Sequence, residues 1–538
     1  MNQLKPKLFS VLKNYSKEQF IKDVIAGIIV AIIALPLSIA LAIASGVSPE
    51  QGLYTAIVAG FFISFLGGSR VQIGGPTAAF VVIIYGIVAE YGMSGLTIAT
   101  IMAGIILVLM GFFRFGSLIK FIPYTITTGF TAGIAVGIFA GQLKDFFGLA
   151  MGALPSEFIE KMAAYAQHFN TINPYALATG ILSLAILIVW PKINKVLPGS
   201  LITIIIATLV VKFTNIPVNT IGSVFGELSS SLPPFIVPSV DFAMVQKLLP
   251  SAFTIAILAG IESLLSCVVS DGMINSRHRS NMELVAQGIG NICSGFFGGI
   301  PATGAIARTA ANVKNGGRTP VAGMVHSITL LFILVLLMPL AALIPMPALA
   351  AVLIMVAYNM SEWRSFVEVC KTAPKSDILV MITTFLLTVI FDLVVAIEVG
   401  IVMAALLLIK RLSDVSEVRS WKYIGLLEVP ENTLVYEIDG PMFFGSADQF
   451  LTISTTPSLE NIILRMRSVP SMDITALNSM KKVYANCKKH NINLIFSHVQ
   501  AQPRKMMEKA GFVAEVGEEN FCKNIHDALA LAKKMGRF

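Results

Sequence analysis

The chain has 538 residues and a formal net charge of +8, and it is 55% hydrophobic but only 13% charged. A soluble globular chain carries about 25% charged residues, so this composition argues against an ordinary soluble protein. The basic balance does not require a nucleic-acid partner, because Lys and Arg flanking membrane spans give the same excess. No basic stretch is interleaved with aromatic residues, and we expect no nucleic acid to bind.

The charged residues concentrate towards the C-terminus. Residues 413–538 hold 29 of the 70 Asp, Glu, Lys and Arg side chains. This single shift in composition predicts a cytoplasmic N-terminal segment at 1–23, a transmembrane domain at 24–412 and a soluble domain at 425–538. The polar lead before the first apolar run argues against a cleavable signal peptide.

Apolar stretches suited to crossing a bilayer core of about 30 Å recur through the first 410 residues. We predict 14 transmembrane segments, at 24–44, 52–68, 76–90, 95–113, 122–143, 176–190, 198–211, 248–270, 283–299, 303–314, 320–344, 346–360, 377–391 and 393–409. With the N-terminus in the cytoplasm, the inside loops hold seventeen Lys and Arg and the outside loops four. The positive-inside rule therefore predicts a multi-pass protein of the inner, or plasma, membrane with both termini cytoplasmic.

The third and tenth segments share an unusual opening. Gly74-Gly75-Pro76-Thr77 precedes one, and Gly298-Gly299-Ile300-Pro301-Ala302-Thr303 precedes the other. They are seven segments apart, so two seven-segment halves would have opposite orientations, as in transporters built from inverted repeats. A single such segment would favour an ordinary kink, whereas two at matching positions favour a binding site.

A helix that begins inside the membrane leaves its first N–H groups without water. An anion satisfies them, and each helix N-terminus adds about half a positive charge. Pro is suited to the first turn of such a helix, because its missing N–H costs nothing there. The predicted substrate-binding residues are Thr77, Ala78, Thr303, Ala305, Ile306 and Ala307. Most would act through backbone N–H groups, and the hydroxyls of the two Thr would either contact the anion or cap the helices.

Two ionisable residues lie in these apolar surroundings. Arg308 would add positive field to the site, the alternative being that it snorkels to the cytoplasmic surface. Glu262 is the carboxylate within a long apolar helix, with Ser266 four residues on and on the same face. Burial disfavours an ionised carboxylate, and an approaching anion disfavours it further. We therefore predict that Glu262, with Ser266, couples proton and substrate movement, the alternative being a structural hydrogen bond.

No metal-ligand cluster, phosphate-binding loop or nucleophile with its base is apparent in the sequence. The five Cys lack metal-ligand spacing, and we infer neither zinc nor disulfides. We therefore expect no catalytic residues, no cofactor and no enzymatic activity.

The motifs Gly75-Pro76-Thr77, Asp271-Gly272-Met273 after Glu262, and Ala307-Arg308 resemble those of the sulfate permease (SulP) family of anion transporters. The resemblance covers nearly the whole chain. It implies seven-plus-seven inverted repeats divided into core and gate domains, a substrate between segments 3 and 10, an elevator-like movement and a homodimer. The strings AIESLLSCVVSDGM, GPTAAFVVI, AIARTAANV and AYNMSE look especially similar to C4-dicarboxylate transporters of this family.

The tail resembles the STAS domain of the same family, an α/β fold. Residues 434–438 and 461–464 read as strands, and 476–489 and 503–510 as helices. Related antagonists of anti-sigma factors are phosphorylated on a Ser just after an Asp, but here Ile474 follows Asp473, leaving Thr475 as a weak substitute. The resemblance implies a role in dimerisation, trafficking or regulation, including a cytoplasmic protein partner.

The leading functional prediction is proton-coupled uptake of a C4-dicarboxylate such as succinate, fumarate or aspartate, by a protein in contact with membrane lipid. The main alternative is sulfate or another inorganic anion, bicarbonate or chloride, because backbone N–H groups accept any compact oxyanion. Outside this class remain an uncoupled anion channel, a nucleobase transporter and a signalling scaffold. Arg308 argues against a neutral substrate, and Glu262 argues against a channel.

Overall fold

The computed structural model describes residues 4–117, 123–155, 157–194, 198–239, 241–391, 393–421, 423–424, 427–430, 432–447 and 459–535. Residue 122, where one predicted segment begins, and the predicted domain limits at 1, 425 and 538 lie outside these residues. The chain divides into two compact units, Met1–Ile401 and Val402–Phe538.

The first unit is almost entirely helical. Its helices are α1 (Leu8–Val11), α2 (Lys17–Ala44), α3 (Pro49–Leu66), α4 (Val81–Phe112), α5 (Tyr124–Phe147), α6 (Phe158–His168), α7 (Pro174–Ile193), α8 (Gly199–Thr214), α9 (Ile221–Phe225), α10 (Phe242–Ile274), α11 (Ser280–Phe296), α12 (Ile306–Lys314), α13 (Val321–Ala341), α14 (Met346–Met360), α15 (Trp363–Thr372) and α16 (Lys375–Ile390). Helix α17 (Leu393–Val415) contains the boundary between the units. Short 3₁₀ turns join them, of which η2 (Ala78–Phe80) matters for the site.

Each of the fourteen predicted segments falls on a helix of the structure. Two of them, 76–90 and 95–113, form one element with a break at Gly92, whose φ of 63° is non-helical. Within the described residues, seven helices are long and apolar enough to cross a membrane. The others are shorter or less apolar, so the full number of crossings stays a prediction. The polytopic helical fold itself is confirmed.

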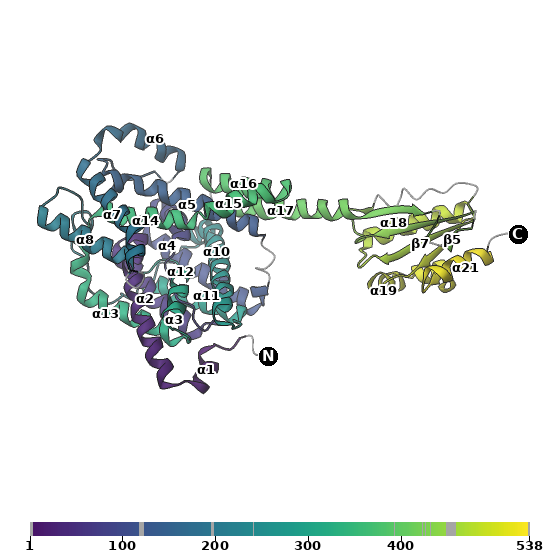
Figure 1. Cartoon of the computed structure of the whole chain (residues 1–538), viewed down its shortest axis with the longest axis horizontal. Coiled ribbons are helices and arrows are strands. Elements are labelled where there is room, and N and C mark those ends of the chain that lie inside the picture. The colour runs from purple at the N-terminus through teal and green to yellow at the C-terminus, as the bar shows by residue number, and fades with distance from the viewer. Residues whose placement is uncertain are drawn as a thin grey trace. The chain divides into compact units, whose positions relative to one another are not determined.

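The helices of the first unit pack in two sets. One set brings α2, α3 and α4 against α10, α11, α12 and α13, and the other brings α5, α7 and α8 together with α14 and α16. In Figure 1 the purple helices α2 and α3 of the first half of the chain accordingly lie beside the teal helices α12 and α13 of the second half. Helices α4 and α11 approach closely at two glycines, because a Cβ on Gly288 would lie 2.5 Å from the Gly104 carbonyl oxygen.

The second unit contains a five-stranded sheet in the order β3-β6-β7-β8-β9. Its strands are β3 (Glu417–Trp421), β6 (Thr433–Asp439), β7 (Asn461–Ser468), β8 (Asn493–Ser497) and β9 (Phe521–Cys522), and a separate pair joins β4 (Tyr423–Ile424) and β5 (Leu427–Glu428). Strand β3 is antiparallel to β6, and the remaining neighbours are parallel.

Helices cover both faces of this sheet, as Figure 1 shows for β7 between α18 and α21. The helices are α18 (Ile474–Lys489), α19 (Ala501–Lys509), α20 (Phe512–Val516) and α21 (Ile525–Met535). Alternate residues of β7 explain the two layers: Ile462 and Leu464 face the core with α18, whereas Ile463 faces the core with α21. The predicted strands and helices of the tail are confirmed.

Candidate anion site

The two glycine-rich segments predicted to face each other meet in a short strand pair. Strand β1 (Gly74–Gly75) is antiparallel to β2 (Thr303–Gly304), with Gly74 opposite Gly304. The Ala305 N–H extends the pairing by donating to the Ile73 carbonyl at 2.9 Å. Asn291 of α11 fixes the residue just before β2. Its side-chain amide donates to the Ala302 carbonyl at 2.9 Å and accepts from the Ala302 N–H at 2.8 Å.

Two helical elements begin directly after this strand pair. Turn η2 starts at Ala78 and continues into α4, and α12 starts at Ile306. Among the described residues, the N–H groups of Ala78, Ala79, Ile306 and Ala307 donate to no backbone carbonyl. Such groups at a helix start carry partial positive charge and are suited to an anion.

Arg308 lies within this arrangement rather than at a surface. Its side chain is 2% exposed, and Nη2 donates to the Pro76 carbonyl, directly before η2. Its Nε and Nη1 atoms have no hydrogen-bond partner within the described part of the chain. The snorkelling alternative is therefore wrong for this structure. An incompletely paired, buried guanidinium is costly unless an anion completes its hydrogen bonds.

Gly75 gives the guanidinium its space. A Cβ at this position would lie 2.5 Å from Arg308 Nη1, and the φ of +152° is rare for residues with a side chain. The glycine of the Gly-Pro-Thr motif is thus required for the close approach of β1 to Arg308.

Glu262 of α10 faces the beginning of η2. Its Oε2 accepts a hydrogen bond of 3.1 Å from the Thr77 hydroxyl, and its side chain is partly exposed. Thr77 occupies the N-cap position of η2, but its side chain makes no capping hydrogen bond. The capping alternative is therefore wrong for Thr77, which instead joins the carboxylate to the start of η2.

Two predicted site groups form hydrogen bonds within the protein instead of facing the anion site. The Thr303 side chain is fully buried, and its hydroxyl bonds to Ser263 Oγ at 2.7 Å and to the Ala259 carbonyl at 2.9 Å. The N–H of Ala305 is used in the strand pairing. Neither group is free to hold an anion, and Thr303 does not cap α12, whose N-cap residue is Ala305.

Ser266, predicted to act with Glu262 in proton coupling, makes its hydrogen bonds with other residues. It donates to Gln72 Oε1 at 2.9 Å and to Thr309 Oγ1 at 3.4 Å, on the side of α10 that packs against the strand pair. Shared spacing on a helix did not bring it into a hydrogen bond with Glu262. Its contacts are those of a residue that positions the surrounding chain.

The expected place of Pro at the start of the tenth segment is wrong as well. Helix α12 begins at Ile306, five residues after Pro301, because Thr303 and Gly304 are taken up by the strand pair. The third segment, by contrast, is a short helical element as predicted, because it ends at the break at Gly92.

Two buried polar residues near the site were not singled out from the sequence. Gln72 Nε2 donates to the Ser263 carbonyl at 3.1 Å, so this side chain links β1 to α10. His326 of α13 is fully buried, and neither ring nitrogen has a partner in the described part of the chain. His326 could have been found as a lone ionisable residue in an apolar segment, whereas nothing in the sequence marks Gln72.

No group of three His, Cys, Asp or Glu side chains is placed to hold a metal ion among the residues that the structure describes. The positive character of the site comes from Arg308 and the helix starts alone.

Relatives of this chain carry names of anion transporters. The "Putative sulfate transporter YvdB" of Bacillus subtilis is 41% identical over 523 residues, which cover 96% of this chain and 98% of that protein. The "Bicarbonate transporter BicA" of Picosynechococcus is 28% identical and covers 94% of both chains.

Solved structures show the same fold. The murine Solute Carrier 26 family member A9 anion transporter, in its inward-facing state, matches with a TM-score of 0.91 and 18% identity, covering 99% of this chain and 94% of the other. The transmembrane domain of a cyanobacterial bicarbonate transporter BicA matches with a TM-score of 0.64 and 29% identity, covering 71% and 98%. The family model described as "Sulfate permease family" matches residues 20–384, and the STAS domain model matches 426–528. The chain therefore belongs to the sulfate permease family of membrane anion transporters and carries a STAS domain.

Proposed function

We propose that this protein imports a small oxyanion together with a proton, and that the anion binds between the starts of η2 and α12. The observation that carries the proposal is the Arg308 guanidinium, buried beside these helix starts with Nε and Nη1 unpaired within the described residues. An oxyanion has several acceptor oxygens, and it would accept from this guanidinium and from the N–H groups of Ala78, Ile306 and Ala307 together.

Glu262 supplies the proton coupling in this proposal. A carboxylate close to the anion repels it when ionised, and protonation removes that repulsion. The hydrogen bond from Thr77 connects the carboxylate to η2, so protonation of Glu262 and occupation of the η2 start act on one another. Proton and substrate then bind together and leave together.

Sulfate is our first candidate for the substrate, and bicarbonate the second. The names of the two relatives favour these compact oxyanions. The four strings that resemble C4-dicarboxylate transporters keep succinate as the third candidate. Thermal stabilisation of the purified protein by each anion, at constant ionic strength, tests the order. A shift with succinate and none with sulfate or bicarbonate would reverse it.

Three further features of the family resemblance belong to the same proposal. The helix set containing α12 moves against the set containing α14 in an elevator-like manner. The protein works as a homodimer. Residues 24–412 form its transmembrane domain, and the STAS domain and both termini lie in the cytoplasm.

The coupling is tested with Glu262→Gln in proteoliposomes. We expect uptake driven by an inward proton gradient to fall to the background level, while exchange of labelled for unlabelled substrate persists. Glu90→Gln is the matched control, because Glu90 is an exposed carboxylate of the apolar helix α4. Unchanged uphill uptake by Glu262→Gln would refute the proposed coupling. It would leave the proposed location of the anion site unaffected.

A further inference from the structure

A cavity lies apart from the anion site, where the N-terminal segment packs against the ends of the helices. It has a volume of about 560 Å³ and is lined by Lys7, Ser10, Val11, Tyr15, Ser16, Gln19, Arg70, Ser276, Arg318 and Thr319. This volume falls within the 300–1,000 Å³ that small-molecule sites occupy. Three lining residues are cationic, and none is acidic.

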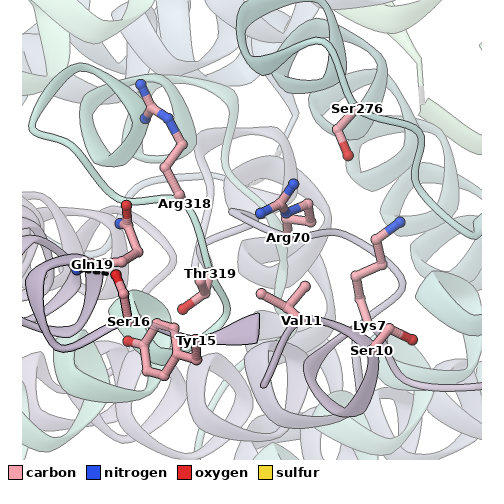
Figure 2. A pocket seen from close by; sticks show the side chains of 10 residues that line it. All are labelled: Lys7, Ser10, Val11, Tyr15, Ser16, Gln19, Arg70, Ser276, Arg318 and Thr319. Carbon is pink, nitrogen blue, oxygen red and sulfur yellow. Dashed lines mark hydrogen bonds between the residues drawn. The ribbon is translucent and has the colours of Figure 1, made fainter. Parts of the chain in front are cut away.

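The cationic ends are held in place by backbone contacts. Lys7 Nζ donates to the Arg277 carbonyl at 2.8 Å, and Arg318 Nη1 donates to the carbonyls of Val313 and Gly317 at 2.8 and 2.7 Å. In the view of Figure 2, Arg70 lies between Lys7 and Arg318. Its Nε atom is buried and has no hydrogen-bond partner in the described part of the chain.

The carboxylates nearest to the cavity lie outside its lining. Asp23 is fully buried behind the lining, and its two oxygens accept from Tyr15, Gln19, Thr319 and the Arg318 N–H. Asp271 is paired with His278 at 2.7 Å, and Glu18 is paired with Lys22 at 2.6 Å. Burial, together with the charges of Arg279 and Arg70, lowers the pKa of Lys7, although Asp271 opposes this. The lining itself therefore carries three cationic side chains and no carboxylate.

The N-terminal segment forms one wall of the cavity. Arg279 fastens this segment by donating to the Lys5 carbonyl at 2.7 Å and to Ser10 Oγ at 3.0 Å, and the Lys7 N–H donates to the Gly67 carbonyl at 2.8 Å. Helix α2 also begins at the cavity, with Ser16 as its N-cap residue. A helix start beside Arg and Lys side chains is suited to a phosphate group.

We propose that this cavity binds the phosphate group of a ligand, and that binding fixes residues 4–16 against α3 and the loop between α10 and α11. The phosphate comes either from the headgroup of an anionic phospholipid, as in basic pockets between membrane helices, or from a soluble phosphate compound. Arg70 and Lys7 hold its oxygens, and the polar side chains of Tyr15, Ser276 and Thr319 surround the remainder.

Hydrogen exchange of residues 4–16 measures occupancy of the cavity. Inorganic phosphate and glycerol phosphate are titrated into the full chain in neutral detergent. Separately, the chain is placed in phosphatidylcholine nanodiscs with or without phosphatidylglycerol. Protection by the soluble compounds identifies a free phosphate ligand, and protection by phosphatidylglycerol alone identifies a lipid headgroup. Protection by neither overturns the proposal.

The variant Lys7→Gln with Arg70→Gln should weaken the protective effect about tenfold or more, because it removes two charged phosphate donors. The matched control is Lys13→Gln with Lys17→Gln, which removes two exposed charges, one in this segment and one at the start of α2, that do not line the cavity. Ser276→Asp places a negative charge in the lining and should weaken the protective effect as the first variant does. Agreement between these two different changes would show that the loss of protection is not a folding defect of the first variant.

Protection must also persist in Arg308→Gln, since that substitution alters the other anion site. Equal protection in the wild type and in both cavity variants, or loss of protection in Arg308→Gln, would show that the phosphate binds elsewhere. Neither result would refute the transport proposal.

Discussion

At the scale of single residues, Arg308 carries the electrostatics of the proposed transport site. We expect Arg308→Lys to lower substrate affinity about tenfold or more, because Lys keeps the charge but lacks the planar fork that bonds two oxygens at once. A hydrogen bond to a charged group contributes about 1.5–3 kcal/mol, and 1.4 kcal/mol is tenfold in affinity. Transport kinetics in proteoliposomes check this, and a KM within twofold of the wild type would contradict it.

The close contact between Gly75 and Arg308 leads to a second prediction at this scale. Gly75→Ala should abolish uptake while the protein still folds, because the new Cβ would displace Arg308 Nη1 from its place 2.5 Å away and the φ of +152° would be strained. Gly86→Ala is the control, since a Cβ on Gly86 in α4 meets nothing within 4 Å. Uptake and the elution profile on size exclusion are measured for both. Normal uptake by Gly75→Ala would remove Arg308 from the transport site.

At the scale of elements, the two glycine-rich openings predicted part of the site's architecture but not all of it. Because they occur at the third and tenth segments, their meeting could be predicted, and the β1–β2 pairing confirms it. The pairing itself could not be predicted, since two-residue strands have no periodicity to read. For this reason the start of α12 was placed too early, and the Thr303 hydroxyl and Ala305 N–H were assigned to an anion although the pairing and α10 use them.

The hydrogen bonds of Thr303 predict that the strand pair depends on α10. Thr303→Val removes both of them and leaves Ser263 and the Ala259 carbonyl without this partner inside the protein. An unsatisfied buried group costs about 1–3 kcal/mol, so we expect a lower melting temperature and weaker substrate binding. The control is Thr127→Val, because the Thr127 hydroxyl bonds only to the Tyr124 carbonyl of its own helix. Equal melting temperatures for the two variants would contradict this dependence.

At the scale of the whole molecule, composition alone separated the two parts of the chain, because apolar membrane helices and a charged soluble fold need different residues. Two strands of the tail were also readable, since β6 and β7 contain apolar runs that are largely buried between helical layers. Substrate identity was not readable. The proposed site consists largely of backbone N–H groups, and these bind sulfate, bicarbonate or a carboxylate alike.

The C-terminal unit has its own core on both faces of its sheet, so we expect residues 413–538 to fold without the membrane domain. Cys487 of α18 reports this folding, because its side chain is fully buried and burial raises the pKa of its thiol to about 11. At pH 8 a thiol of that pKa is about one part in a thousand thiolate, whereas an ordinary thiol of pKa about 8.5 is roughly a quarter ionised.

Iodoacetamide should therefore modify Cys487 slowly in the isolated fragment and rapidly in urea, with the change following one cooperative transition. The partly exposed Cys522 is the internal comparison in the same fragment. Rapid modification of Cys487 without denaturant would mean that the unit depends on the rest of the chain, because only an open core makes that thiol accessible.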